Sequence, residues 1–357
     1  MRLEDFDRPR GVVYIMTNSA VENEIVAFRR FKDGRLALRD FFRTGGRGID
    51  GGVDPLSSQG SLILSHCGRF LFNVNAGSNT ITSFRVMRDG GLVRASVVNS
   101  GGVRPNSLTQ HCDILYVSNV GDSDDNIASN ITGFTIDRCG VLRRIRDSTR
   151  PLSTPNAQPA RVLFSPCGDQ LLVSEVNTNK ITVFSINRNG TATLQKVNDS
   201  NGAGPFGMVF GRCNILLVAE SVANALSSYR LNPDGTLTVI SGSVSTEQQA
   251  TCWVAISRSG RFAYTSNTAS GTISVFRVRE NGILTLLENV RSTREERPRG
   301  EPIDNAVSPN GRFFYVLNGN QGTISVFAIC ENGRLMRIQV TSGVGVPLFG
   351  TQGLAVR

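Results

Sequence analysis

Residues 303–340 read IDNAVSPNGRFFYVLNGNQGTISVFAICENGRLMRIQV, and this stretch contains one complete structural repeat. Its apolar runs, rich in β-branched and aromatic residues, predict four strands over residues 303–308, 312–318, 322–329 and 335–340. Pro309-Asn310-Gly311 predicts the first turn, and Asn332-Gly333 predicts a tight hairpin before the last strand. Four short strands joined in this way form one small antiparallel sheet.

The same unit recurs seven times along the chain. An aromatic residue marks the third strand of each unit, at Phe28, Phe84, Phe134, Phe184, Tyr229, Phe276 and Phe327, and the spacings lie between 45 and 56 residues. A turn glycine follows each aromatic, at Gly34, Gly90, Gly140, Gly190, Gly235, Gly282 and Gly333. A period near 50 built from β-type runs is typical of a propeller, in which each sheet is buried by its neighbours. The sequence therefore predicts an all-β fold, a seven-bladed β-propeller with four antiparallel strands per blade.

The two chain ends predict how the ring closes. Residues 11–18 resemble a second strand with no first strand before it, and residues 353–356 resemble the missing first strand. We therefore expect the C-terminal strand to complete the N-terminal blade and close the ring. The expected organisation is a single domain over residues 1–357, with residues 1–10 as an N-terminal extension.

Composition bears on partners and location. The formal charge is +9, but the arginines are scattered, and the densest segment, residues 291–299, also contains Glu295 and Glu296. We therefore expect no nucleic-acid partner. The chain has no apolar stretch of 18 residues, and its first residues lack the apolar core of a secretory signal. The expectation is a cytoplasmic protein without a membrane partner.

The predicted blades sort the loops onto two faces of the ring. Loops that lead into first strands, and loops between second and third strands, share one face, which we call the loop-rich face. It collects long, irregular segments, among them residues 44–48, 58–60, 75–79, 148–159, 204–207, 252–253 and 302–304. The opposite face, the turn face, carries short and repetitive turns. Irregular loops on a regular scaffold favour a binding site at the centre of the loop-rich face.

Histidine and cysteine gather on the turn face instead. The chain has two histidines, His66 and His111, in turns between first and second strands. Five of its seven cysteines also lie in turns of this face: Cys67, Cys112, Cys167 and Cys213 between first and second strands, and Cys139 in a hairpin turn. An odd count of cysteines without a C-x-x-C motif is typical of separate thiols. We expect no metal and no cofactor, with three alternatives left open: a zinc site between adjacent His-Cys pairs, a disulfide between neighbouring turns, and a cation in the acidic loop 122–126.

Two glutamates are the main exceptions within the repeat. Five repeats end their second strand in Asn, whereas the fourth and fifth end in Glu175 and Glu220. A carboxylate at the edge of a funnel can act as general acid or base. The alternative is a hydrogen-bonded loop residue that does for its turn what Asn does in the other repeats.

Several motifs carry a resemblance to a known family. The turn Ser308-Pro309-Asn310-Gly311-Arg312, the strand Tyr315-Val316-Leu317-Asn318 and the strand Thr323-Ile324-Ser325-Val326-Phe327 resemble the lactonase family of seven-bladed propellers. This family includes 6-phosphogluconolactonase and 3-carboxymuconate-cyclizing enzymes, and the likeness spans nearly the whole chain. The resemblance implies a reaction that opens or forms a lactone without metal, through a histidine, two arginines and a glutamate at the funnel.

Of those four groups, the glutamate has a match in Glu220. Phe206-Gly207 stand where the family has Arg-His, residues 158–161 contain no histidine, and Gln249-Ala250 stand where the second arginine is expected. The chain is more similar to a subgroup of unassigned activity, marked by Ser-Gln-Gly (58–60), Asn-Ala-Gly-Ser-Asn (75–79), Ser-Thr-Arg-Pro-Leu-Ser (148–153), Pro-Phe-Gly (205–207) and Cys-Trp (252–253).

Two hypotheses of function follow. The first is a hydrolase or isomerase of a small lactone or cyclic ester, with Glu220 and Glu175 as catalytic residues. The residues that we expect to bind its substrate are Gln59, Arg161, Phe206, Trp253, Arg299 and Asp304. The second is a non-catalytic propeller that binds a small ligand or a protein partner through the same face, with Phe206 and Trp253 as apolar anchors.

Overall fold

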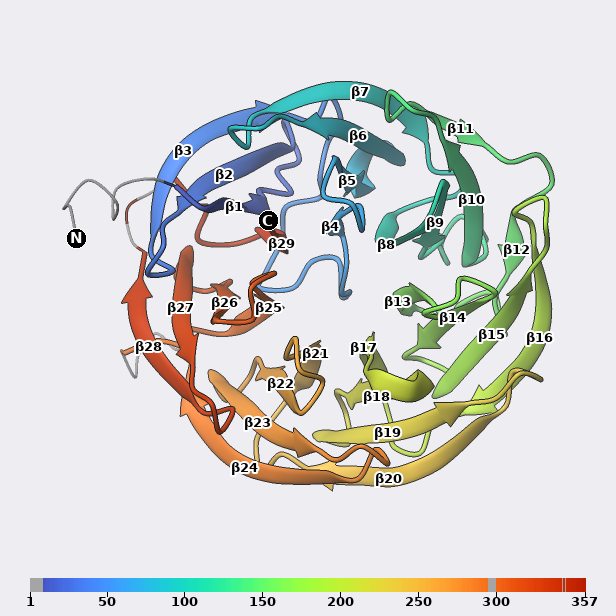
Figure 1. The fold of residues 1–357 in the computed structure, drawn as a ribbon. Coiled ribbons are helices and arrows are strands. Elements are labelled where there is room, and N and C mark those ends of the chain that lie inside the picture. Colours follow the sequence, from blue (N-terminus) through green and yellow to red (C-terminus); the bar gives the residue numbers. More distant parts are fainter. Residues whose placement is uncertain (1–8, 295–299, 342, 344) are drawn as a thin grey trace.

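The computed structural model describes residues 9–294, 300–341, 343 and 345–357. Seven antiparallel sheets stand around a central axis as the blades of a ring (Figure 1). The predicted seven-bladed propeller with four antiparallel strands per blade is confirmed. Within the described ranges the helical elements are two 3₁₀ turns, η2 (Ala76–Ser78) and η3 (Arg212–Asn214).

Each blade runs from its first strand at the axis to its last strand at the rim. Blades 1 and 2 are β29 (Gln352–Val356), β1 (Gly11–Met16), β2 (Glu24–Arg30), β3 (Leu36–Arg43), and β4 (Leu62–Leu64), β5 (Phe70–Asn75), β6 (Thr80–Val86), β7 (Leu92–Asn99). Blades 3 and 4 are β8 (Pro105–His111), β9 (Ile114–Asn119), β10 (Asn130–Ile136), β11 (Leu142–Arg144), and β13 (Pro159–Phe164), β14 (Gln170–Glu175), β15 (Lys180–Ile186), β16 (Ala192–Asp199). The short β12 (Arg150–Pro151) also pairs with β10.

Blades 5 to 7 keep the same order. Blade 5 is β17 (Pro205–Phe210), β18 (Ile215–Glu220), β19 (Ala225–Leu231) and β20 (Leu237–Ser245). Blade 6 is β21 (Thr251–Ile256), β22 (Phe262–Asn267), β23 (Thr272–Val278) and β24 (Leu284–Arg291). Blade 7 is β25 (Pro302–Val307), β26 (Phe313–Asn318), β27 (Thr323–Ile329) and β28 (Leu335–Val340).

The predicted ring closure is confirmed in blade 1. Strand β29 pairs antiparallel with β1, and Tyr14 lies opposite Ala355. The pairing continues past the strand end, where the Val12 amide donates to the Arg357 carbonyl at 3.1 Å and the Arg357 amide donates to Val12 at 2.8 Å. The first and last strands of the described chain therefore share one sheet.

The core lies between the blades, and the second strand of each blade is its most buried part. Every residue of β5, β14, β18, β22 and β26 is buried. These strands are covered on both faces by neighbouring blades, so apolar residues occur on both faces and polar ones such as Asn73, Ser174 and Thr265 are also buried. The outer strands have one covered face, and β7 accordingly alternates between exposed and half-buried residues toward its end.

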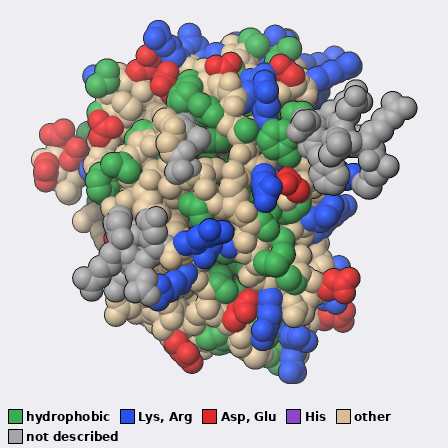
Figure 2. Space-filling model, turned by 90° about the vertical axis from the view of Figure 1, so that its left-hand side faces the viewer, with side chains coloured by type: hydrophobic (Ala, Val, Ile, Leu, Met, Phe, Trp, Pro, Cys, Tyr) green, Lys and Arg blue, Asp and Glu red, His purple; other side chains and the backbone are tan. Residues whose placement is uncertain are grey.

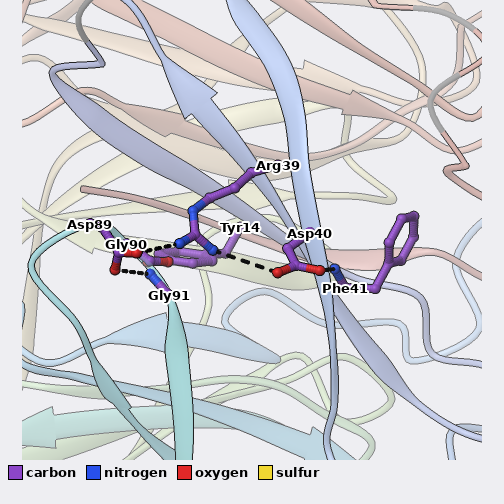
Figure 3. Close-up of polar contacts among 7 residues, drawn as sticks. All are labelled: Tyr14, Arg39, Asp40, Phe41, Asp89, Gly90 and Gly91. Carbon is purple, nitrogen blue, oxygen red and sulfur yellow. Dashed lines mark hydrogen bonds and ion pairs between the residues drawn. The ribbon is translucent and has the colours of Figure 1, made fainter.

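A tyrosine hydroxyl links several neighbouring blades. Tyr14 on β1 donates to the carbonyl of Gly90, in the outer hairpin of blade 2, at 2.8 Å (Figure 3). Burial raises the pKa of Tyr14 to about 12. The same bond is made by Tyr116 to Gly190 at 2.7 Å, by Tyr264 to Gly333 at 3.1 Å and by Tyr315 to Gly34 at 2.9 Å. In each of these pairs, the carbonyl of the repeat glycine is therefore the atom through which a hairpin is hydrogen-bonded to the preceding blade.

An ion pair strengthens the junction between blades 1 and 2. Arg39 on β3 pairs with Asp89 at 2.7 Å, and Asp89 also accepts a hydrogen bond from the Gly91 amide at 3.0 Å (Figure 3). On the side of the ring formed by β3 and β28, Lys and Arg side chains are spread among acidic and apolar ones (Figure 2). Among the described residues, no helix has the length and apolar character that crossing a bilayer requires.

Candidate functional site

The centre of the loop-rich face is occupied by the chain itself. Between β3 and β4 the chain leaves the rim and runs into the middle of the ring (Figure 1). We call residues 53–60 the axial segment. The Ser58 carbonyl accepts hydrogen bonds from Trp253 Nε1 on blade 6 at 3.1 Å and from Gln352 Nε2 on blade 1 at 3.0 Å. The Gln59 amide donates to the Ala160 carbonyl on blade 4 at 2.9 Å. The axial segment therefore connects blades that are not neighbours in the ring.

Arg161 of β13 reaches this segment from blade 4. Its Nη1 donates to the carbonyl oxygens of Gln59 at 3.2 Å and Leu108 at 3.1 Å. Its Nε is buried and has no hydrogen-bond partner within the described residues. Burial lowers the pKa of Arg161 to about 10, and the negative charge of Asp304 acts in the opposite direction. The guanidinium group is thus held at the axis with part of its donor capacity unused.

Gly60 makes room for that guanidinium group. Its φ is +85°, a conformation that L side chains rarely adopt, and a Cβ placed there would lie 1.5 Å from Arg161 Nη1. The glycine of the Ser-Gln-Gly motif is therefore required by both backbone conformation and space.

Asp304 on β25 lies close enough to Arg161 for their charges to interact. Its Oδ1 accepts from the Asn305 amide at 2.8 Å, and its Oδ2 accepts from the Leu354 amide at 3.1 Å. Burial raises the pKa of Asp304 to about 8, against the opposing effects of the Asn305 amide and the Arg161 charge. Asp304 thus joins blade 7 to β29 and supplies a titratable group near Arg161 at the axis.

Asp54, in the axial segment, is the group that the sequence did not single out. Its Oδ1 accepts a hydrogen bond from Gln352 Nε2 at 2.6 Å. Burial raises the pKa of Asp54 to about 7, although the bond from Gln352 acts to lower it. The residue is half-buried. A carboxyl group that titrates near neutral pH can accept a proton during a reaction.

A small cavity opens beside the axial segment on the loop-rich face. Its volume is about 190 Å³, and Pro55, Leu56 and Ser57 form one wall. Arg104 and Gln158, from the loops before β8 and β13, lie on the other side.

Glu175, at the end of β14, is fully buried. Its carboxylate accepts hydrogen bonds from the Ser153 amide at 3.3 Å, from Thr178 Oγ1 at 3.0 Å and from Thr182 Oγ1 at 2.5 Å, and it also accepts one from Ser153 Oγ. The carboxylate holds the loop before β13 against the end of its own blade.

Glu220, at the end of β18, is fully buried in the same way. Its Oε1 accepts from the Gly202 amide at 2.9 Å and from Ser227 Oγ at 2.6 Å, and its Oε2 accepts from Ser243 Oγ at 2.7 Å. Both carboxylate oxygens are thus engaged by donors from the loop before β17 and from strands β19 and β20.

Three of the asparagines at the same strand position, Asn75, Asn267 and Asn318, make a matching contact with the opposite polarity. Asn267 Nδ2 donates to Ser274 Oγ at 2.8 Å, seven residues further along the chain. Glu220 accepts from Ser227 across the same sequence separation. This is the arrangement expected for a hydrogen-bonded loop residue. A catalytic role for Glu220 and Glu175 stays a prediction, and it would require these donors to be displaced.

The predicted substrate-binding residues meet in part. Gln59, Arg161, Asp304 and Trp253 all border the axial segment, whereas Arg299 lies outside the described residues. Trp253 and Phe206 are buried and pack edge to face, with ring centroids 5.2 Å apart. Gln59 donates through Nε2 to the Val254 carbonyl at 2.8 Å. The two buried aromatic rings therefore support the axial segment and do not line an open surface.

The seven cysteines of the chain are all free thiols, so the disulfide between neighbouring turns is not formed. The described residues contain no group of three or more His, Cys, Asp or Glu side chains arranged to hold a metal ion. This observation applies to the His-Cys turns and to the acidic loop 122–126 alike, and neither supports a cation site.

Known proteins resemble this chain in both sequence and fold. The family described as "Lactonase, 7-bladed beta-propeller" matches residues 127–253 and 236–349. A 6-phosphogluconolactonase of Serratia proteamaculans is 25% identical over 266 residues, which cover 71% of this chain and 76% of the relative. A 6-phosphogluconolactonase of Formosa agariphila is 25% identical over 316 residues, which cover 80% of this chain and 86% of the relative.

Among solved structures, the periplasmic gluconolactonase of Pseudomonas aeruginosa superposes with a TM-score of 0.71 at 18% identity, covering 97% of this chain and 99% of that chain. At this identity the likeness concerns the fold. The family match itself extends over more than half of the sequence, from residue 127 to residue 349. The chain belongs to the lactonase family of seven-bladed β-propellers.

Proposed function

We propose that this protein hydrolyses a small sugar-acid lactone at the axis of the loop-rich face, with Asp54 as general base and Arg161 as the group that binds the anion. The observation that carries this proposal is the half-buried Asp54 carboxyl of the axial segment, whose pKa is raised to about 7 and whose chain neighbour Pro55 lines a small cavity. Relatives named 6-phosphogluconolactonase support the substrate class, since they are 25% identical over most of the chain.

The proposed reaction uses two side chains, Asp54 and Arg161, and a water molecule. Asp54 accepts a proton from water as the water oxygen bonds to the lactone carbonyl carbon. The Arg161 guanidinium, with its Nε unpartnered among the described residues, balances the charge that develops on the carbonyl oxygen. The ring C–O bond then breaks, the proton passes to the ring oxygen, and the product is an open-chain hydroxy acid. The same groups would serve the reverse reaction, in which a lactone ring closes.

Glu220 is the competing candidate for the general base, because it is the residue that matches the family's glutamate. Glu220 is fully buried and accepts three hydrogen bonds, so its carboxylate is less available to a water molecule than that of Asp54. In our proposal Glu220 and Glu175 hold the loops that shape the site, and Gln59, Asp304, Phe206 and Trp253 fix the axial segment on which Asp54 lies.

A lactone panel separates these roles. The purified protein is assayed on 6-phosphogluconolactone, glucono-δ-lactone and simple aliphatic lactones. We expect Asp54→Asn to lower kcat by about 100-fold or more, as loss of a general base does. Glu220→Gln should retain kcat per folded molecule. Asp50→Asn, which changes an exposed carboxyl of the same loop, is the matched control. Full activity of Asp54→Asn would refute the assignment.

A binding propeller is the second candidate, and one observation favours it. The backbone and side chains of the axial segment are bonded to blades 1, 4 and 6, and a cavity of about 190 Å³ lies beside it. Absence of turnover on every lactone of the panel would overturn the hydrolase and favour binding of a ligand or protein partner through the loop-rich face.

A further inference from the structure

A second cavity, with both histidines in its lining, lies on the turn face, away from the proposed lactone site. Its volume is about 720 Å³. It extends below blade 3, from the β4–β5 turn of blade 2 to the β13–β14 turn of blade 4. A volume of this size falls within the range of about 300–1,000 Å³ that is usual for small-molecule sites.

A shortened turn in blade 3 accounts for this space. In blade 2, Leu64 pairs with Leu71, so the turn encloses the six residues 65–70. In blade 3, the matching pair is Gln110 with Leu115, which encloses four residues, and the pairing continues inward to His111 with Ile114. Blade 4 again encloses six residues, 165–170, between Phe164 and Leu171. The turn of blade 3 is therefore two residues shorter than those of both neighbours, which project beyond it on either side.

The lining of the cavity is apolar at its floor. Phe70 and Phe164 lie there, together with Ile136 and Leu163, and both rings are largely buried. The His111 ring lies against Phe164, with ring centroids 5.9 Å apart. Flat side chains of this kind offer a surface on which a planar group can stack.

Two arginines and two aspartates lie at the rim of the cavity. Arg69 and Arg138 line it, and neither forms an ion pair with a described residue. Of the two acids at the rim, Asp137 is engaged by its own turn, where its Oδ1 accepts from the Cys139 and Val141 amides at 2.8 and 2.9 Å. Asp113 is the other acid, on the blade 3 turn. Two guanidinium groups without a carboxylate partner, above an apolar floor, favour a ligand with a negative charge at one end.

We propose that the turn-face cavity binds a small planar anion, an aromatic carboxylate or sulfonate, with its ring on the floor and its charge toward Arg69 and Arg138. This site is separate from the axial one and does not depend on the proposed lactonase activity.

Cys67 provides a chemical reporter at the mouth of the cavity. Its Sγ lies 3.4 Å from both Arg69 Nε and Ser65 Oγ. Partial burial acts to raise the pKa of Cys67, but these hydrogen bonds and the Arg69 charge lower it to about 7. A large part of this thiol is thus ionised at neutral pH, and the thiolate is the form that reacts with alkylating reagents.

The first test uses 8-anilinonaphthalene-1-sulfonate, a planar aromatic anion whose fluorescence rises on binding. We expect one site per chain, and a Kd about tenfold weaker in Arg69→Gln and in Arg138→Gln, because each loses a charged contact. Arg261→Gln and Arg188→Gln are the matched controls. Arg261 occupies the turn position of Arg69 and stacks on Phe262 as Arg69 stacks on Phe70, and Arg188 occupies the hairpin position of Arg138. All four arginines are exposed.

The second test measures protection of Cys67. Iodoacetamide alkylates a thiolate by forming a carbon–sulfur bond as iodide leaves. Saturating 8-anilinonaphthalene-1-sulfonate should slow the labelling of Cys67 several-fold and leave the labelling of Cys167, at the same turn position in blade 4, unchanged. Equal affinity of the probe for all variants, or equal labelling rates with and without it, would overturn the proposal.

Discussion

The two faces of this propeller differ in a way that inverts the usual relation between loop length and open space. On the loop-rich face the long segment between β3 and β4 folds back into the axis, and residues 53–60 fill it. On the turn face the first turn of blade 3, which is shorter than those of its neighbours, leaves a cavity of about 720 Å³.

This difference teaches that loop length indicates a site only when the path of the loop is known. The polar groups of a long loop can all be taken up by hydrogen bonds to the rest of the fold, as many are in the axial segment. They then link strands and are not free to bind a ligand. A short turn on a regular scaffold can expose the sides of its neighbours, and the exposed surface then includes residues that were otherwise core, such as Phe70 and Phe164.

The largest effect is expected from Gly60→Ala, which tests whether the axial segment is fixed. The new Cβ combines an unfavourable φ of +85° with a position 1.5 Å from Arg161 Nη1. We expect a loss of about 3–4 kcal/mol in the free energy of unfolding, measured in urea. Gly52→Ala, in the same loop with no atom within 4 Å of its Cβ, should be nearly neutral. Equal stability of the two variants would mean that the axial segment is not held as described.

A smaller effect is expected from Glu220→Gln, which separates a structural from a catalytic role on the loop-rich face. The amide replaces one of two oxygens that accept hydrogen bonds from Gly202, Ser227 and Ser243. We expect about 2–3 kcal/mol of destabilisation by thermal unfolding, because a buried charged acceptor is lost. Glu280→Gln, at an exposed position, is the control. A variant with wild-type stability but no lactone turnover would restore Glu220 as the general base.

The smallest effect concerns pH and the axial carboxyl groups. An unfolded aspartate ionises near pH 4, whereas burial raises the pKa of folded Asp54 to about 7. Between these values the unfolded chain holds fewer protons than the folded one, so the free energy of unfolding falls as the pH rises. A rise in pKa from near 4 to about 7 corresponds in full to about 4 kcal/mol, but Asp54 keeps part of its surface in contact with water, which weakens the effect. We therefore expect Asp54 to contribute about 1–2 kcal/mol of this fall between pH 4 and 8.

Urea titrations of wild type and Asp54→Asn across this pH range measure that contribution. The variant should lose less stability as the pH rises, because its amide side chain has no proton to release in this range. Identical slopes for the two proteins would contradict a raised pKa at Asp54. On the turn face, Asp113→Asn removes an exposed carboxyl and serves as the control, with a slope expected to match that of the wild type.

The fold could be predicted from the sequence because the residues that indicate it are local and recur in every repeat. The aromatic at Phe327 and the glycine at Gly333 recur in every unit, and each unit forms its own sheet from adjacent strands. The ring closure was accessible for a related reason. A blade that starts at its second strand needs a first strand from elsewhere, and residues 353–356 were the remaining candidate.

The site was harder to predict from the sequence because its residues contact partners that are distant along the chain. The two glutamates were identified as exceptions, but their burial depends on donors such as Thr182 and Ser227, seven residues further along. That spacing was present in the sequence and matches the Asn267–Ser274 pair. The role of Asp54 offered no such signal, since its partner Gln352 lies 298 residues away.

The axial segment also has a consequence for the order of folding. Residues 53–60 are synthesised early, yet their partners Trp253 and Gln352 emerge much later, the second of them with the last strand. Contacts of such long sequence separation slow folding, because the intervening chain must be ordered before they form. The contacts of the axial segment are therefore completed last, and a nascent chain that lacks β29 has neither the full set of these contacts nor a closed ring.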